Sequence, residues 1–378
     1  MSAEPELYLG LISGTSADAI DVALASFEPI PRLHACLAFP YPSELRARVI
    51  ALARERAHLN LDDLGVLDTA LGKAFAEAAI ALLQSANTPR SAIRALGSHG
   101  QTVRHRPFGE HPFTLQTADP NVIAELTGIT TVADFRRRDV AAGGQGAPLL
   151  PAFHHTLLAK QGSARVVLNL GGIANITVLP ADNIHPVMGC DTGPANCLMD
   201  AWATRHLQQP RDDNGVWARQ GRVDPALLQR LLSESYFAAP APKSSGRELF
   251  NIDWLERQLE GLTPKAVDVQ ATLLALTVRS IADAIARFAP DTREVLLCGG
   301  GVHNTALFQS LEAALAPRAV ASTAMHGVDP DFVEAMAFAW LAYRRLRGLP
   351  GNLVSVTGAS GPRVLGAVYF GSAETGLS

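Results

Sequence analysis

The feature that most constrains this chain is a strand–loop–strand pattern that occurs once in each half. In the first copy the loop begins with Gly14-Thr15-Ser16, and in the second it is Gly171-Gly172. The apolar runs that flank these loops are residues 7–13, 22–27, 166–170 and 176–179. Each copy is typical of a β-hairpin, because two β-compatible runs are joined by a short loop of small and polar residues. The repeat favours two lobes built on a similar plan.

Helical and strand patterns alternate through the rest of the sequence. Helices are predicted over residues 59–83, 194–207, 266–288 and 332–346, and strands over residues 92–96, 130–133, 294–298 and 366–370. This alternation favours the α/β class. The length of 378 residues suits two lobes, of which we expect residues 1–133 to form the first and 134–346 the second. We expect residues 347–378 to pack back on the first lobe, and 208–250 to form an irregular excursion on the second.

The composition excludes several classes of protein. Lysine and arginine total 32 against 36 aspartates and glutamates, so the chain has no basic surface for nucleic acid or an anionic membrane. No apolar run is long enough to be expected to span a bilayer, and the N-terminus lacks the basic residues of a secretory signal. The four cysteines include no Cys-x-x-Cys pair. We therefore expect a globular cytoplasmic protein that takes a small-molecule substrate.

A third glycine-rich loop, Gly299-Gly300-Gly301, follows the apolar run 294–298. Small residues allow backbone N–H groups to approach phosphate oxygens closely, so three such loops at strand ends are compatible with a polyphosphate site. Ordinary tight turns explain each loop alone equally well. The P-loop signature G-x-x-x-x-G-K-[ST] is missing, and no G-x-G-x-x-G follows the first strand.

Several charged residues are candidates for chemistry, each with a structural alternative. Asp18 and Asp21 flank the first loop, where their carboxylate oxygens are suited to bind Mg²⁺. The alternative is that they are there only because aspartate is favoured in turns. Asp191 precedes Thr-Gly-Pro, which is equally typical of a helix N-cap. Glu334 completes a capping-box pattern with Asp331. Arg136 is the first of three consecutive arginines. These could face a substrate anion, and the alternative is that they are only solvated.

Taken together and in order, these motifs resemble those of the anhydro-N-acetylmuramic acid kinase family. The first loop resembles that family's G-T-S-x-D-G-x-D motif, with Ala19 where the family usually has glycine. The resembling segments span nearly the whole chain: Gly14-Thr15-Ser16-Ala17-Asp18-Ala19-Ile20-Asp21, Ser98-His99-Gly100-Gln101-Thr102, Asp134-Phe135-Arg136, 139–144, 169–175, Asp191-Thr192-Gly193-Pro194, Gly299-Gly300-Gly301 and 334–339. If Ala19 requires a positive φ, its side chain strains the loop.

The resemblance implies the two-lobed fold of sugar kinases, Hsp70 and actin, with ATP and Mg²⁺ in the cleft between the lobes. It also implies hydrolytic opening of the 1,6-anhydro ring and phosphorylation of O6, in cell-wall recycling. Residues 14–21 and the glycines at 171, 172 and 299–301 would bind nucleotide, and Asp191 would be the catalytic base. Thr102, Arg136 and Glu334 would contact the sugar. The family further suggests a homodimer.

Two alternatives remain open on the sequence. An ordinary hexose or aminosugar kinase of the same superfamily would consume no water. A nucleotide-dependent switch like actin or Hsp70 would turn ATP over slowly, whether or not sugar is present. A sugar-responsive repressor would need a helix-turn-helix segment before the first strand, and only six residues precede Leu7.

Overall fold

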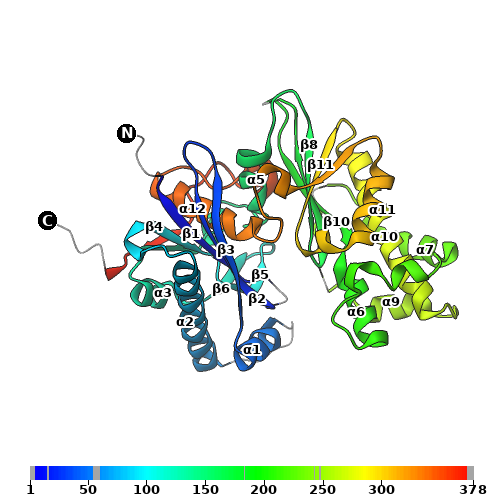
Figure 1. Cartoon of the computed structure of the whole chain (residues 1–378), viewed down its shortest axis with the longest axis horizontal. Coiled ribbons are helices and arrows are strands. Elements are labelled where there is room, and N and C mark those ends of the chain that lie inside the picture. The colour runs from blue at the N-terminus through cyan, green and yellow to red at the C-terminus, as the bar shows by residue number, and fades with distance from the viewer. Residues whose placement is uncertain are drawn as a thin grey trace. The chain divides into compact units, whose positions relative to one another are not determined.

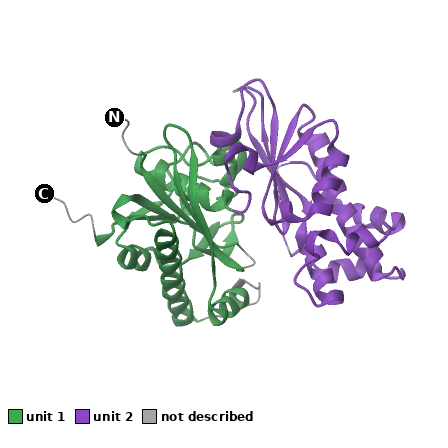
Figure 2. Ribbon diagram, viewed as in Figure 1, with its two compact units in different colours: residues 1–153, 332–378 green, residues 154–331 purple. Residues whose placement is uncertain are grey.

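The computed structural model describes residues 5–14, 17–53, 60–182, 184–241, 243–246 and 248–372. The chain divides into two compact units (Figures 1 and 2). Unit 1 comprises residues 1–153 and 332–378, and unit 2 comprises residues 154–331. Both combine a mixed sheet with helices, so the α/β class predicted from the sequence is confirmed.

The main sheet of unit 1 is built around the predicted N-terminal hairpin. Strand β1 (Leu7–Ile12) pairs antiparallel with β2 (Ala19–Ser26) and parallel with β4 (Ile93–Ser98). Across the sheet the order is β13-β7-β4-β1-β2-β3. The remaining members are β3 (Arg32–Pro40), β7 (Thr131–Ala133) and β13 (Ala367–Tyr369). A separate ribbon is formed by β5 (Gln101–Arg106) and β6 (Phe113–Thr117).

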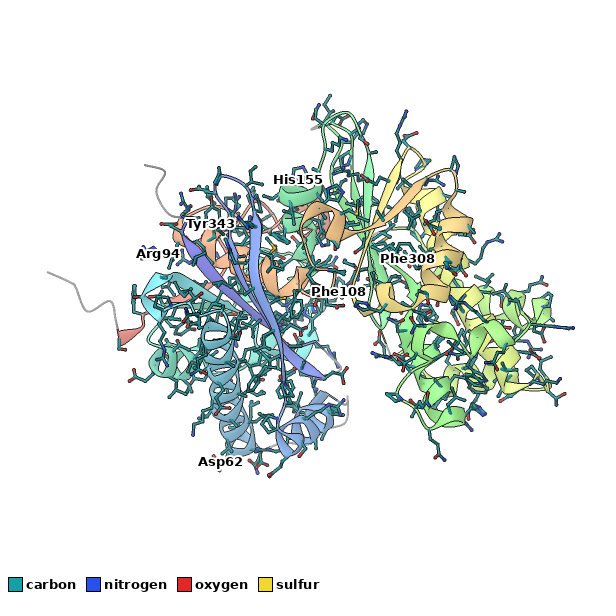
Figure 3. All side chains as sticks on the ribbon, in the orientation of Figure 1. Asp62, Arg94, Phe108, His155, Phe308 and Tyr343 are labelled. Atoms are coloured by element: carbon teal, nitrogen blue, oxygen red, sulfur yellow. The ribbon has the colours of Figure 1, made fainter. Side chains whose placement is uncertain are left out.

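Two long helices cover the opposite faces of this sheet. Leu9 and Leu11 of β1 share an apolar cluster with α2 (Leu61–Ser85), whereas Gly10 between them faces α12 (Val333–Leu346). Side chains alternate between the two faces along a strand, which explains why neighbouring residues meet different helices. Farther along α12 lies Tyr343, which is labelled in Figure 3. Its ring packs edge-on against that of Tyr8, with 5.6 Å between the ring centroids.

Shorter helices complete unit 1. They are α1 (Ser43–Ala53), α3 (Pro120–Thr127), α4 (Arg137–Ala141) and α13 (Val354–Thr357). The helix α5 (Leu150–Leu158) carries the chain from unit 1 into unit 2.

The sheet of unit 2 has the order β10-β9-β8-β11-β12. The second predicted hairpin is confirmed as β8 (Arg165–Leu170) and β9 (Ile173–Leu179), paired antiparallel. The parallel strand beside β8 is β11 (Glu294–Cys298), at the bounds expected from the sequence. The outer strands are β10 (Met188–Pro194) and β12 (Ala319–Ser322).

Helices of unit 2 pack on this sheet around α10 (Ala266–Phe288), whose apolar face belongs to the unit's core. Within the described ranges, α10 is the single helix long and apolar enough to cross a membrane, but 61% of its most apolar window is buried. That burial identifies α10 as a core helix. The other helices are α6 (Asn196–Leu207), α7 (Pro225–Leu232), α8 (Ser235–Ala238), α9 (Ile252–Leu259) and α11 (Thr305–Leu315).

The division between the units differs from the expected boundaries at 133/134 and 346/347. Residues 134–153 stay with unit 1, where the ring of Phe135 packs on Phe338 at 5.6 Å. The helix α12 also belongs to unit 1, because it contacts β1, β2 and β4. Pairing of β13 with β7 adds the C-terminal strand to the same unit. Local composition, from which the boundaries were drawn, does not record such contacts between distant segments.

Candidate active site

The loop of the first hairpin is held by side chains from other elements of unit 1. The N–H of Ala17 donates to the carbonyl of Gly14 at 3.0 Å, and Gln101 Nε2 donates to the same carbonyl at 3.3 Å. Arg46 Nε donates to the carbonyl of Ala17 at 3.0 Å. Thr15 and Ser16, both expected to bind nucleotide, lie outside the described residues. Sequence analysis did not assign Gln101 or Arg46 to this loop, since both lie far from it along the chain.

The two aspartates of this loop have different surroundings. The carboxylate of Asp18 is exposed and lies 2.6 Å from Arg46 Nη2. Asp21 lies within β2, opposite Ile12 of β1. Within the described ranges, no group of three or more His, Cys, Asp or Glu side chains is placed to hold a metal ion. A Mg²⁺ ion carried by phosphates needs only one or two carboxylates, so this donor set fits it.

Ala19 does not have the positive φ considered from the sequence. It begins β2, in register with Pro40 of β3, and Ile20 follows in the same strand with a fully buried side chain. The positive φ falls instead on Ala17, at 49°. The condition for strain at Ala19 is therefore not met, because an extended strand residue accepts a Cβ without penalty.

Arg136 is bound in unit 1 by His99 and a loop carbonyl. Its Nε donates to His99 Nε2 at 3.0 Å, and its Nη1 donates to the carbonyl of Gly146 at 2.8 Å. His99 Nδ1 lies 2.9 Å from the carbonyl of Gly100, which can only accept, so the imidazole carries its proton on Nδ1. Burial, and next the Arg136 charge, hold the pKa of His99 well below its ordinary value. His99 is thus a neutral acceptor that orients the guanidinium.

A buried carboxylate fixes the turn that carries Arg136. Asp139 Oδ2 accepts the N–H of Gly146 at 2.7 Å, and its Oδ1 accepts from Asn352 and Thr357 at 2.7 and 2.8 Å. The last two residues come from the C-terminal part of unit 1. The chain around 139–144, one of the family-like segments, therefore has a structural role in positioning Arg136.

Glu334 lies in the first turn of α12 and interacts electrostatically with Arg136. Burial raises the pKa of Glu334, and Arg136 partly offsets that rise. Burial also lowers the pKa of Arg136 to about 10, opposed by the charges of Glu334 and Asp139. The capping-box alternative for Glu334 is wrong, because α12 has Phe332 at its N-cap with no side-chain cap.

Thr102, the third expected sugar contact, lies on the β5–β6 ribbon. Its Oγ1 accepts a hydrogen bond from Gln116 Nε2 at 3.2 Å. Unit 1 thus brings Arg136 and Glu334 into electrostatic contact and places Thr102 three residues after His99, the partner of Arg136.

In unit 2, the two glycine loops lie at the same end of the sheet. Gly171 and Gly172 form the turn between β8 and β9, and Gly299-Gly300-Gly301 follows the parallel strand β11. A Cβ on Gly299, where φ is 81°, would overlap Asn169 Oδ1. A Cβ on Gly301 would meet Leu170. Glycine is required at these two positions because the loop packs directly on the end of β8.

The first backbone N–H groups of α6 donate hydrogen bonds to the carbonyls of the hairpin turn. Ala195 and Cys197 donate to the carbonyl of Gly172 at 3.0 and 3.1 Å, and Asn196 donates to that of Gly171 at 3.1 Å. Asn196 Nδ2 also donates to the carbonyls of Leu170 and Gly171. These bonds fix the turn, so its own N–H groups are the ones that remain to face an anion.

Asp191 lies on β10, and the helix-cap alternative for it is wrong. The N-cap of α6 is Ala195, and Asp191 pairs with Asn175 of β9 instead. Since Asn175 also pairs with Asn169 of β8, three polar residues form a row across adjacent strands. Residues directly opposite one another in a sheet present side chains on the same face. The sequence places both asparagines in the family-like segment 169–175, but it does not show that they lie beside Asp191.

Within the region 208–250, residues 236–241 and 243–245 hold Asp191 by hydrogen bonds; we call these residues the strap. Ser245 N–H donates to Asp191 Oδ2 at 2.9 Å, and the N–H of Asp191 donates to the carbonyl of Lys243 at 3.0 Å. Tyr236 Oη donates to the carbonyl of Asp191 at 3.0 Å. Within the part of the chain that the structure describes, Oδ1 of Asp191 accepts no hydrogen bond. That oxygen is available to a ligand.

Burial raises the pKa of Asp191 to about 6. The Ser245 hydrogen bond and Lys243 oppose that rise, whereas Glu248 adds to it. A carboxylate that titrates near pH 6 is ionised at neutral pH yet remains a stronger base than an exposed aspartate.

Two glycine hairpins and a half-buried carboxylate with a free oxygen are compatible with a phosphotransferase, and the comparisons with known proteins identify the class. A family model described as anhydro-N-acetylmuramic acid kinase matches residues 6–371. An anhydro-N-acetylmuramic acid kinase of Xanthomonas campestris pv. campestris (strain 8004) is 52% identical over 367 residues, covering 96% of this chain and 97% of the relative. The corresponding protein of Coxiella burnetii (strain RSA 493 / Nine Mile phase I) is 50% identical over 366 residues, covering 97% and 98%.

Solved structures show more distant likeness. A ROK hexokinase from Thermus thermophilus is 17% identical with a TM-score of 0.38, over 89% of this chain and 99% of that one. The activator of 2-hydroxyisocaproyl-CoA dehydratase from Clostridium difficile is 10% identical with a TM-score of 0.46, over 90% and 96%.

The protein is therefore an ATP-dependent sugar kinase. It belongs to the anhydro-N-acetylmuramic acid kinase family, whose role is in cell-wall recycling. The resemblance stated from the motifs is confirmed.

Proposed function

We propose that the chain couples hydrolytic opening of the 1,6-anhydro ring to phosphorylation of O6, with Asp191 as the general base. Water attacks C1, and its proton passes to Asp191 Oδ1. The C1–O6 bond breaks, and O6 attacks the γ-phosphorus of ATP. The products are N-acetylmuramic acid 6-phosphate and ADP. The observation that carries the assignment is a carboxylate with one oxygen anchored by Ser245, one oxygen free, and a pKa of about 6.

For the phosphates, we propose that each hairpin loop supplies backbone N–H groups. The loop of residues 14–21 would serve from unit 1, and Gly171-Gly172 with Gly299-Gly300-Gly301 from unit 2. Mg²⁺ would neutralise charge on the transferring group, held through Asp18 or Asp21. The ion pair between Asp18 and Arg46 is exposed, so exchanging it for a metal costs little.

For the sugar, we propose that Arg136 pairs with the lactyl carboxylate. A guanidinium suits this role because its planar fork matches a carboxylate. Within the described residues, Nε and Nη1 donate to His99 and to the Gly146 carbonyl, so Nη2 is the nitrogen available to a ligand. Glu334, beside Arg136, and Thr102 would orient the sugar hydroxyls. We further propose a cytoplasmic homodimer, in keeping with the family resemblance.

Turnover in ¹⁸O-labelled water tests the coupled reaction. Early samples, taken before anomeric exchange, should carry one label at C1 of the sugar and none in the new phosphate. Label in the phosphate, or none at either position, would contradict hydrolytic opening and favour an ordinary sugar kinase.

Replacement of the base tests its role. Asp191→Asn keeps an acceptor for Ser245 N–H, so the strap and nucleotide binding should persist while turnover falls by at least ~10²-fold. Ring opening and ADP release should fall together. Turnover within a few-fold of wild type in the folded variant would remove Asp191 from the mechanism.

A further inference from the structure

A cavity of about 390 Å³ lies in unit 2 and is bounded by α10. One stripe of α10 forms much of its wall, and the strap, β10 and the last residue of α7 supply the rest. The charged lining side chains are Lys243, Arg279, Asp283 and Arg287, and the others are Thr192, Leu232, Phe237, Ser280, Ala284 and Phe288. The cavity therefore combines an excess of positive charge with two aromatic rings.

The charges in the cavity are only partly neutralised. Arg279 forms an ion pair with Asp283, with Nε 2.9 Å from both carboxylate oxygens. Arg287 Nη1 donates to the carbonyls of Ala238 and Ala239 at 3.0 and 3.3 Å. Lys243 Nζ donates to the carbonyls of Tyr236 and Phe237 at 2.9 and 3.1 Å. In the described ranges Lys243 and Arg287 have backbone partners but no carboxylate, so both retain donors and charge for an anion.

The same cavity borders the support of Asp191. Thr192 follows Asp191 directly on β10, and Lys243 supplies the carbonyl that accepts the Asp191 N–H. A Cβ on Gly193 would lie 2.7 Å from Phe237 and 3.2 Å from Ser280, so the strand, the strap and α10 are in close packing. A ligand held there contacts the strap that positions the proposed base.

We propose that this cavity is a regulatory site for a small organic anion that carries a phosphate or carboxylate on an apolar group. The anionic group would pair with Lys243 and Arg287, and the apolar part would pack between Phe237 and Phe288. The bound anion would place a negative charge next to β10. That charge would disfavour the ionised form of Asp191, which is the form that accepts a proton, and so it would slow turnover. This effect on rate rests on the proposed function of Asp191, whereas binding to the cavity does not.

The groups that face Asp191 determine how the effect depends on pH. Lys243 favours the ionised carboxylate, and Glu248 disfavours it; Tyr236 and Cys190 interact with it electrostatically and remain neutral, because burial raises the pKa of both. An added anion acts in the direction of Glu248, so the inhibition should be strong near pH 6 and weak at pH 8.

Binding is measured by calorimetry with phenyl phosphate, in saturating magnesium and a non-hydrolysable ATP analogue that keeps the phosphate loops occupied. Inorganic phosphate and phenol supply the anionic and apolar parts separately, and each should bind at least ~10-fold more weakly. Arg287→Gln should weaken the binding of phenyl phosphate by at least ~10-fold. The matched control is Arg230→Gln, since Arg230 Nη1 also donates to two carbonyls, those of Gln258 and Glu260, but lies outside the cavity. The control should bind as wild type does.

Absence of binding to the wild-type enzyme, or equal loss in both variants, would overturn the site. For regulation, phenyl phosphate should lower kcat/KM at least ~3-fold at pH 6 and under ~2-fold at pH 8. Arg287→Gln should abolish this inhibition. The inhibition is taken as the ratio of kcat/KM without and with phenyl phosphate in the same protein, because Arg287 also holds the strap at Ala238 and Ala239 and its loss changes the basal rate. Binding that survives without any effect on rate would overturn the regulatory role. Inhibition of the same size at both pH values would overturn its route through Asp191, and the labelled-water experiment tests the reaction itself separately.

Discussion

At the scale of single residues, the environment of Asp191 serves activity at the expense of stability. Burial disfavours the charged carboxylate, which raises its pKa to about 6 from an ordinary value of 3.8. A raised carboxyl pKa means that the folded state binds the proton more tightly than the unfolded state does. The contribution of Asp191 to stability is therefore most favourable at acid pH and is lost as the pH rises from about 4 to about 6.

The first prediction follows from this linkage. At pH 8 the ionised, half-buried carboxylate should cost up to ~3 kcal/mol of unfolding free energy, so Asp191→Asn should be more stable than wild type by up to that amount. At pH 4 the two proteins should be nearly equal. Urea unfolding followed by tryptophan fluorescence at both pH values measures the difference. The matched control is Asp253→Asn, at an exposed position on α9. Its free energy of unfolding should stay within ~0.5 kcal/mol of the wild-type value at either pH. An Asp191→Asn protein less stable at pH 8 would contradict the burial argument.

At the scale of elements, α12 is the helix whose placement most affects the candidate site of unit 1. Its backbone lies directly on the sheet, because β1 and β4 present glycines to it. A Cβ on Gly10 would lie within covalent-scale distance of the Ala335 carbonyl, and a Cβ on Gly97 would do the same at Phe338. Glu334 is adjacent to that contact, so the approach of α12 to the sheet sets its position beside Arg136.

The second prediction concerns this contact. Gly10→Ala should force α12 away from the sheet and destabilise the protein by at least ~2 kcal/mol, since backbone atoms cannot move aside as a flexible side chain does. The control is Gly65→Ala within α2, where a new Cβ meets nothing within 4 Å. That change should stabilise the helix by ~0.5–1 kcal/mol. Thermal unfolding of the two variants compares them, and equal stability would show that α12 tolerates displacement.

At the scale of the whole molecule, the two units differ in how the chain builds them. Unit 2 is one continuous segment, residues 154–331, which contains all five strands of its sheet and its apolar core cluster. Unit 1 is assembled from two segments. The second segment supplies β13, which pairs with β7 of the sheet, and α12, which packs on one face of that sheet.

The third prediction is that residues 154–331 fold alone, whereas residues 1–153 do not. A segment with its own sheet and core retains most of its buried apolar surface when excised. Loss of α12 would expose the face of the first sheet around Gly10 and Gly97. Circular dichroism with urea titration should give a cooperative transition for residues 154–331 and a non-cooperative signal for 1–153. Cooperative unfolding of both segments would mean that α12 is dispensable for unit 1.

Local pattern in the sequence was sufficient for the elements and for the identity of the family. The bounds of α10 and β11 were predicted as observed, because helical periodicity and strand composition act between near neighbours. The two hairpins were also predicted, but β2 and β9 each begin three residues before the predicted apolar run. The motifs around Asp191, Arg136 and Glu334 were sufficient to indicate the family, because the residues of each motif and the order of the motifs can be seen in the sequence alone.

Tertiary structure alone decided the unit boundaries and the surroundings of the candidate catalytic groups. Asp191 lies on a strand, anchored by Ser245, rather than capping a helix, and Arg136 is oriented by His99. The strap, the polar row of Asn169, Asn175 and Asp191, and the return of α12 to unit 1 all join residues far apart in the chain. A sequence pattern records which residues can form an element. Which elements meet depends on burying their apolar faces and satisfying their polar groups together, and that is settled only when the whole chain packs.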